Sequence, residues 1–135
     1  MDRAPEMAKR LALPTVDIEV VFDFNSSEIT AKAAEQLRTL GQAMADPRLA
    51  DARFVIAGHT DARGRPAYNL TLSQARAEAV RWHIVQTYGI KAENLFARGF
   101  GQRQLKNRAN PRADENRRVQ IINFTGVAAD GRRRR

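Results

Sequence analysis

A short apolar run over residues 54–58, Phe-Val-Ile-Ala-Gly, gives way at once to a polar loop, and this transition constrains the fold most. The run has the length and composition of a buried strand. Residues 58–67 hold two glycines, a proline and three charged residues, so they form a loop. A helix then begins near Asn69 and ends at Tyr88, where Gly89 supplies a left-handed stop.

The patterns of the flanking segments also predict strands and a helix. Residues 16–22 alternate apolar and acidic side chains, as a half-buried strand does, and residues 30–45 have helical spacing behind Thr30, a plausible N-cap. Two more strands are predicted over residues 94–100 and 119–124. This order predicts an α/β fold of the α+β sandwich type, with a mixed sheet of about four strands and two main helices packed on one face.

The length of 135 residues suits one domain with a single core. We expect that domain over residues 16–125, with residues 1–15 as an N-terminal segment or linker and residues 126–135 as a basic tail. The net charge of +8 favours an anionic partner, but it does not distinguish nucleic acid, acidic lipid headgroups and a carboxylate-bearing polymer. Half of that charge lies in Arg132 to Arg135, a run typical of a solvated tail.

Several classes of site are excluded by what the sequence lacks. There is no cysteine, which removes disulfides, thiolate catalysis and Cys-based metal sites. No apolar stretch reaches the length of a secretory signal or the roughly 18 residues of a membrane span. We therefore expect a segment that does not itself span a membrane and that, if it lies outside the cytoplasm, is a fragment of a longer protein.

The polar loop after residues 54–58 is a favourable place for a ligand, because backbone N–H groups and side chains converge where a strand end meets a helix start. In the helix that follows, Asn69, Ser73 and Arg76 share one face, which overlaps the apolar stripe that should pack on the sheet. A cation there needs a carboxylate, since desolvating it alone would cost several kcal/mol. Asp61 and a bound ligand are both candidates. An internal Asp61–Arg76 salt bridge that only fastens the loop to the helix is an equal alternative.

Other candidate chemistry is weaker. His59 has only His83 as a second imidazole and no zinc-site spacing, so we expect a hydrogen-bonded structural histidine and no metal. No nucleophile elbow and no Gly-Lys-Ser/Thr phosphate loop is present. Strand alternation should turn either Arg117 or Arg118 toward the core side or a pocket rim, although a pair of solvated charges at a strand end is the usual alternative.

Four motifs stand in order along the chain. They are Phe22-Asp23-Phe24-Asn25-Ser26, Gly58-His59-Thr60-Asp61, Tyr68-Asn69-Leu70-Thr71-Leu72-Ser73-Gln74-Ala75-Arg76-Ala77 and Asn116-Arg117-Arg118-Val119. Together they resemble the OmpA-like domain family, the C-terminal peptidoglycan-binding module of outer-membrane protein A and its relatives, over residues 16–124. The arginine-rich connection 102–112 departs from the family pattern, because it lacks the usual proline after the third strand.

The resemblance implies a noncatalytic module that binds the diaminopimelate residue of the peptidoglycan stem peptide. The family's ligand aspartate and arginine match Asp61 and Arg76, whose carboxylate and planar guanidinium suit the ammonium and carboxylate of a zwitterion. By the same match, Asn69 should help to hold the amino acid end. Three further residues should line the pocket: Asp23, Phe24 and Arg117.

The resemblance also implies a location and a partner. We expect a periplasmic domain of an outer-membrane or other envelope-anchored protein, with peptidoglycan as its partner and no cofactor. Homo-oligomers are compatible with the sequence, and the parent protein is expected to carry the membrane anchor. Trp82, the lone tryptophan, lies opposite the core stripe and should be exposed or contact a partner.

Two other classes of function are weighed against this one. A small basic nucleic-acid-binding domain would account for the net charge, but the predicted sheet has no aromatic stacking platform and no helix typical of groove reading. A cell-wall hydrolase could pair Asp23 with Asp61. Arg76 beside them would keep both carboxylates ionised and leave no general acid.

Overall fold

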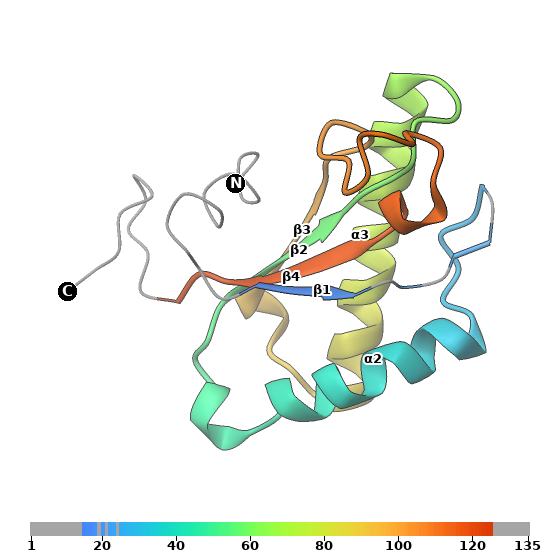
Figure 1. The fold of residues 1–135 in the computed structure, drawn as a ribbon. Coiled ribbons are helices and arrows are strands. Elements are labelled where there is room, and N and C mark those ends of the chain that lie inside the picture. The colour runs from blue at the N-terminus through green and yellow to red at the C-terminus, as the bar shows by residue number, and fades with distance from the viewer. Residues whose placement is uncertain (1–14, 19, 21, 24, 126–135) are drawn as a thin grey trace.

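The computed structural model describes residues 15–18, 20, 22–23 and 25–125, and its elements follow the predicted order (Figure 1). The main elements are β1 (Thr15–Ile18), α2 (Ala31–Met44), β2 (Phe54–Gly58), α3 (Pro66–Tyr88), β3 (Leu95–Gly99) and β4 (Val119–Asn123). Short 3-10 helices lie between some of them: η1 (Pro47–Leu49), η2 (Ala92–Asn94) and η3 (Asp114–Asn116). The tail predicted over residues 126–135 lies outside the described residues.

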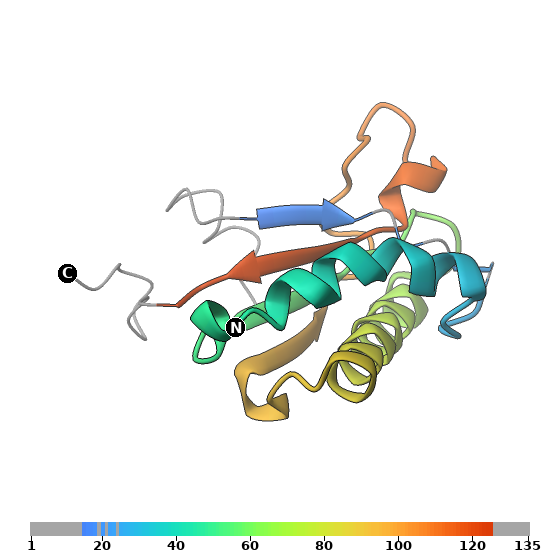
Figure 2. The ribbon, with the colours of Figure 1, turned by 90° about the horizontal axis from the view of Figure 1, so that it is seen from below.

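The four strands form one mixed sheet in the order β1-β4-β2-β3. Strand β4 is antiparallel to both of its neighbours, whereas β2 and β3 are parallel and are joined by the crossover helix α3. Both helices cover the same face of the sheet and lie next to each other, as Figure 2 shows. The predicted α+β sandwich with helices on one face is therefore confirmed.

The main core lies between these helices and the sheet. The predicted stripe of α3, Ala77, Val80 and Ile84, is fully buried there together with Ala33 and Leu37 of α2. A second apolar cluster on the opposite face of the sheet consists of Val55, Ala57, Phe100, Ile122 and Phe124. Since alternate residues of a strand point to opposite faces, β2 is buried along its whole length, as its apolar run predicts.

The helix ends follow the capping rules with one correction. The side chain of Thr30 accepts a hydrogen bond from the backbone N–H of Ala33, which confirms the predicted N-cap of α2. Helix α3 begins at Pro66 and not near Asn69, because a proline is well accommodated in the first turn, where its missing N–H has no partner to lose. It ends at Gly89 with φ 69°, as predicted. No described helix combines the length and apolar character needed to cross a bilayer.

The first strand is shorter than its alternating pattern predicts. Strand β1 pairs with β4 from Thr15 to Ile18, and Ile18 lies opposite Val119, the first residue of β4. Because β4 offers no backbone partner before Val119, pairing stops there. Val20 and Phe22 lie beyond the strand but remain buried in the core, so the apolar half of the prediction holds.

Two paired glycines allow α3 to pass very close to the sheet. Gly58 and Gly99 are partners in the parallel register of β2 and β3. A Cβ atom added to Gly58 would lie 2.2 Å from the carbonyl oxygen of Ser73. One added to Gly99 would lie 2.3 Å from the backbone nitrogen of Gln74. The first half of α3 is therefore held directly over the ends of both strands, where only glycine leaves enough room.

We predict that Gly58→Ala lowers the free energy of unfolding by about 3 kcal/mol, because the added methyl group overpacks the contact and forces the backbone of α3 to move. The measurement is urea denaturation followed by circular dichroism. Gly89→Ala is the comparison, since a Cβ there meets nothing within 4 Å and only the left-handed conformation opposes it, at about 1 kcal/mol. Equal losses in the two variants would contradict the close approach.

Candidate functional site

A small depression of about 70 Å³ lies where the loop after β2 meets the first turns of α3. Ten residues line this depression, which we call the clamp pocket: Asn25, Thr60, Asp61, Arg63, Gly64, Tyr68, Asn69, Leu72, Arg76 and Arg117. The fold thus brings together four of the residues predicted for a ligand, although they come from three separate segments of the chain. The close packing of α3 on the strand ends is what places them side by side.

Arg76 is a buried cation without an ionic partner among the described residues. Its side chain is on α3 and is 2% exposed. The guanidinium donates to the backbone carbonyls of Ser26 (2.9 Å) and Asp23 (3.3 Å) and stacks over the ring of Phe22 at 5.0 Å. Burial, and then the charge of Arg117, lower the pKa of Arg76 to about 10. Carbonyl dipoles and an aromatic ring contact this charge, the more distant charge of Asp61 partly offsets the lowering of its pKa, and no described carboxylate forms a salt bridge with it.

Asp61 is a buried carboxylate surrounded by donors. Its Oδ1 accepts from the backbone N–H of Arg63 at 2.9 Å. Its Oδ2 accepts from the side chains of Arg63 (3.0 and 3.2 Å) and Arg117 (3.0 Å). Burial alone would raise the pKa of Asp61, but the hydrogen bonds from Arg63 and Arg117 outweigh it and lower that pKa. The carboxylate is therefore ionised and cannot serve as a general acid near neutral pH.

No direct salt bridge joins Asp61 to Arg76. The ion pairs of Asp61 go to Arg63 and Arg117, and the hydrogen bonds of Arg76 go to backbone carbonyls. The alternative of an internal Asp61–Arg76 bridge is therefore wrong. The clamp pocket instead presents an anion and a cation that are held separately, by different partners, within one small space.

Asn69 lines the clamp pocket and also fixes its loop. Its Nδ2 donates to the carbonyl oxygen of Arg63 (2.7 Å) and to Oε1 of Gln102 (2.8 Å), with a longer contact to the carbonyl of Asp61 (3.4 Å). Within the described part of the chain, no donor reaches its Oδ1. One end of this amide therefore stabilises the loop, while the other can accept a hydrogen bond.

The remaining predicted residues have different positions. Arg117 follows η3 and bridges Asp61 and Asp114, with its side chain 19% exposed. Its neighbour Arg118 is buried and donates to the carbonyl of Gln104 (3.0 Å), so the alternative of two solvated charges is wrong. Asp23 contributes its backbone carbonyl to Arg76, while the residue itself is exposed. Phe24 lies outside the described residues.

Arg63 and Tyr68 are pocket residues that the sequence reasoning did not single out. Arg63 contacts Asp61 through both its backbone and its side chain, a local turn in which a carboxylate accepts the N–H two residues ahead. The Asp-x-Arg spacing in a glycine-containing loop is the signal that could have revealed it. Tyr68 is 47% exposed beside the pocket, and an exposed aromatic in the first turn of a helix carries no such local signature.

Asn116 fixes the long connection between β3 and β4 against the clamp pocket. The residue is fully buried, its Oδ1 accepts from the backbone N–H of Asn107 (2.7 Å), and its Nδ2 lies 3.1 to 3.2 Å from three carbonyl oxygens of the connection. One of these, on Pro111, also accepts from the backbone N–H of Ala62 (2.8 Å). The loop that carries Asp61 is thereby tied to the connection.

His59 behaves as a structural histidine, as predicted. It is 1% exposed, its Nε2 lies 2.7 Å from Oε1 of Gln120, and its ring stacks on Phe100. Burial, and then the charge of Arg118, lower the pKa of His59 to about 3. Among the described residues, no group of three or more His, Asp or Glu side chains is placed to hold a metal ion.

Known proteins are similar to this chain in sequence and in fold. The sequence model of a family described as "OmpA family" matches residues 21–119. Outer membrane porin F of Pseudomonas aeruginosa is 33% identical over 87 residues, which are 64% of this chain and 24% of that protein. The chain spans about a quarter of the length of the first curated relatives that it matches.

Two solved structures of known proteins have the same fold. The peptidoglycan-associated lipoprotein from Burkholderia pseudomallei is 28% identical, with a TM-score of 0.65, and the match covers 84% of this chain and 92% of that one. The cell wall anchor of the T6SS from Pseudomonas aeruginosa is 25% identical, with a TM-score of 0.63, over 91% and 97% of the two chains. The architecture is therefore that of known envelope proteins.

We predict that His59 makes the fold less stable in acid. The unfolded chain takes up a proton on this residue below pH 6.5, whereas the folded chain does so only near pH 3, so stability is present above pH 6.5 and is lost as pH falls. The expected loss is about 1.4 kcal/mol per pH unit, or about 2 kcal/mol at pH 5.

The measurement is urea denaturation from pH 7 to 4.5 on the wild type and on His59→Gln, whose side chain does not titrate. The slope of unfolding free energy against pH should decrease by about one proton in the variant. Identical slopes would show that His59 takes up its proton over the same pH range in the folded and unfolded chains, which would contradict the prediction.

Proposed function

Because this chain belongs to the OmpA family, we propose that it binds peptidoglycan through the diaminopimelate residue of the stem peptide, as a noncatalytic anchor. The observation that carries the proposal is Arg76, a buried guanidinium with no carboxylate partner among the described residues, in the same pocket as the ionised Asp61. Such a charge is costly to bury, and an anionic ligand would offset that cost.

The free end of diaminopimelate is a zwitterion and matches both groups. Its carboxylate can approach Arg76, whose planar guanidinium is suited to bidentate recognition of carboxylates. Its ammonium can donate to Asp61 and to Oδ1 of Asn69. The ammonium would replace one of the two guanidinium groups that donate to Asp61. The side chain of Arg63 is more exposed than that of Arg117, at 37% against 19%.

A single clamp of this kind supports modest affinity. Hydrogen bonds to charged groups contribute about 1.5 to 3 kcal/mol each, and part of that gain here is spent on displacing a guanidinium from Asp61. Retention on the cell wall would then come from multivalency, since a polymer with many identical stems, met by many copies on one membrane, greatly increases avidity.

The similar proteins support the same role. One solved structure at 28% identity is named a peptidoglycan-associated lipoprotein, and one at 25% a cell wall anchor. By analogy, we place this domain in the periplasm, where it would hold an outer-membrane or other envelope-anchored parent protein to the wall. The lowered pKa of Asp61 supports binding and not hydrolysis, because a hydrolase needs a protonated acid beside its base.

We predict that Asp61→Asn and Arg76→Gln each reduce binding to purified diaminopimelate-type sacculi by at least about tenfold, because each removes one charge-assisted contact with the zwitterion. Cosedimentation over a range of sacculus concentrations gives the affinity. Free meso-diaminopimelate should compete for the wild type.

The matched control is Arg81→Gln on the same helix. This arginine also donates to backbone carbonyls, those of Leu95 (2.9 Å) and Ala92 (2.7 Å), but it lies outside the clamp pocket. It should bind sacculi like the wild type once folding is confirmed by circular dichroism. Full binding by both pocket variants, in the folded state, would refute the clamp.

A further inference from the structure

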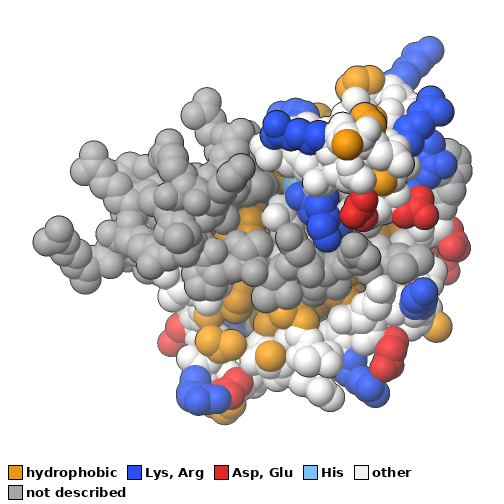
Figure 3. Space-filling model, viewed as in Figure 1, with side chains coloured by type: hydrophobic (Ala, Val, Ile, Leu, Met, Phe, Trp, Pro, Cys, Tyr) orange, Lys and Arg blue, Asp and Glu red, His pale blue; other side chains and the backbone are white. Residues whose placement is uncertain are grey.

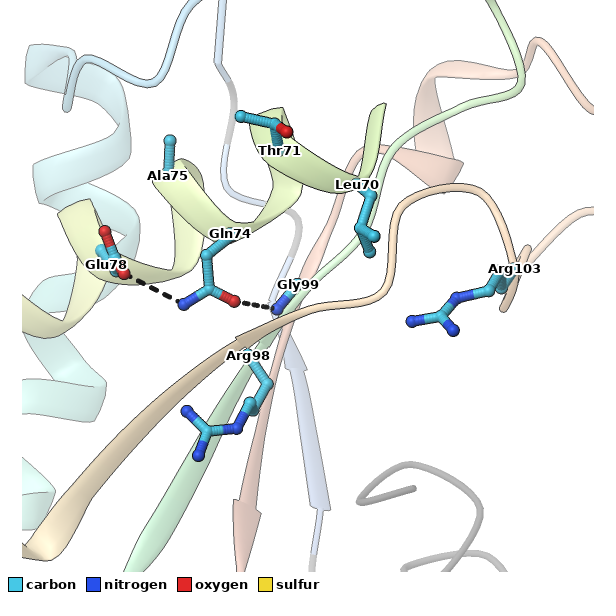
Figure 4. Close-up of a pocket in the computed structure, with 8 residues that line it drawn as sticks. All are labelled: Leu70, Thr71, Gln74, Ala75, Glu78, Arg98, Gly99 and Arg103. Carbon is cyan, nitrogen blue, oxygen red and sulfur yellow. Dashed lines mark hydrogen bonds between the residues drawn. The ribbon is translucent and has the colours of Figure 1, made fainter. Parts of the chain in front are cut away.

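An open groove of about 580 Å³ runs between the outer side of α3 and the free edge of β3 (Figure 4). Its lining residues are Leu70, Thr71, Gln74, Ala75, Glu78, Arg98, Gly99 and Arg103. None of them lines the clamp pocket. On a helix, Leu70, Gln74 and Glu78 lie on the side opposite to Leu72 and Arg76, so the two recesses flank α3.

Two arginines give this groove its charge. Arg98 donates to the carbonyl of Ala97 (2.8 Å), and Arg103 donates to that of Phe100 (3.3 Å). Neither forms an ion pair with a carboxylate of the described residues. Both guanidinium groups therefore keep most of their donors for a ligand.

The surroundings of the groove are strongly basic. Residues 95–113 contain five cations and no acid: Arg98, Arg103, Lys106, Arg108 and Arg112. Figure 3 shows Lys and Arg side chains around the end of the molecule that carries the loops after β2 and β3. This end should attract an anionic polymer over distances of about a Debye length.

Part of the free edge of β3 is blocked against strand addition. β3 is an edge strand, and such an edge normally offers backbone groups to an added strand. Here the amide of Gln74 occupies two of them: it accepts from the N–H of Gly99 (2.7 Å), as Figure 4 shows, and it donates to the carbonyl of Ala97 (3.1 Å). Arg81 covers the carbonyl of Leu95 in the same way. Three backbone groups of the edge are thus already engaged, whereas the charged side chains of the groove remain available to a ligand.

One carboxylate across from the two guanidinium groups narrows the class of ligand. Glu78 lies on α3, where its carboxylate accepts from Gln74 (3.0 Å), while Arg98 and Arg103 approach from the β3 side (Figure 4). A polyanion with a phosphate on every unit would meet repulsion from Glu78. Stem peptides carry separate carboxylates and, on diaminopimelate, an ammonium, so they fit this mixed charge.

The groove and the clamp pocket belong to one connected unit. The turn after β3 links them, because Gln102 accepts from Asn69 at the pocket, while Gly101 donates to the hydroxyl of Ser73 (2.8 Å) within α3. A Cβ on Gly101 would lie 3.1 Å from the backbone nitrogen of Leu70, so this turn packs tightly on the helix. The pocket and the groove are thus held at a fixed spacing.

We propose that this groove is a second subsite that binds the carboxylates of a neighbouring stem peptide of the same polymer through Arg98 and Arg103. The inference rests on the proposed function, because the clamp pocket holds the first stem. Free diaminopimelate fills the clamp without the rest of the polymer, so its affinity should not depend on the groove.

The test is the double variant Arg98→Gln, Arg103→Gln, assayed with purified sacculi and with free meso-diaminopimelate. We expect sacculus affinity to decrease about three- to tenfold, as for the loss of exposed ion pairs, while the affinity for free diaminopimelate stays unchanged. The control double variant, Lys32→Gln with Arg38→Gln, removes the same charge from exposed positions of α2 and should bind both ligands like the wild type.

Four results would overturn the second subsite. If the groove variant bound sacculi with the same affinity as the wild type, the second subsite would be refuted, whereas the clamp pocket would remain supported. An equal loss in the control variant would indicate general attraction by net charge. Loss of binding to vesicles containing anionic phospholipid, with sacculus affinity unchanged, would assign the groove to a membrane surface. If the wild type itself bound neither sacculi nor diaminopimelate, the proposed function would fail together with this inference.

Discussion

The contact between α3 and the ends of β2 and β3 is the constraint on which the rest of the structure depends. Gly58 and Gly99 lie next to each other in the sheet and let the backbone around Ser73 come within reach of both strands. Since the helix cannot slide along this contact without a clash, the side chains on either side of it are fixed relative to the loop after β2. One such side chain is Arg76, and the loop carries Asp61.

The electrostatics of the site follow from that fixed geometry. Arg76 is placed where it meets only carbonyl oxygens and the ring of Phe22, while Asp61 is placed among guanidinium donors. Each group therefore keeps its charge, and the two do not form a salt bridge with each other. A pocket with this separation is ready for a ligand that brings both signs of charge, and it has little to offer a neutral one.

Sequence patterns revealed the parts of this structure that depend on local or periodic signals. The cap at Thr30, the buried run of β2 and the core stripe of α3 follow from spacing alone, and the shared face of Asn69 and Arg76 follows from helical geometry. The absence of an Asp61–Arg76 salt bridge could not be predicted. The partners of Arg76 are backbone carbonyls some 50 residues earlier in the chain, and a backbone group leaves no mark on the pattern of side chains.

Contacts between distant parts of the chain account for the other differences between the predicted and the observed structure. Strand β1 ends at Ile18 because the register with β4 runs out there, although the alternating pattern continues beyond it. The groove beside β3 likewise arises from the way an exposed side of α3 meets a sheet edge. Exposed positions show no periodic constraint, so residues such as Arg98 and Glu78 appear in the sequence only as ordinary surface charges.

The hydrogen bonds to the edge of β3 have a consequence beyond ligand recognition. A domain that decorates a polymer would stand near many copies of itself, and an open strand edge would invite those copies to join sheet to sheet. In this fold the outward carbonyls of Leu95 and Ala97 and the N–H of Gly99 are engaged by Gln74 and Arg81. One helix thus has two roles, since it carries Arg76 on one side and leaves fewer backbone groups of the sheet edge open to a second copy on the other.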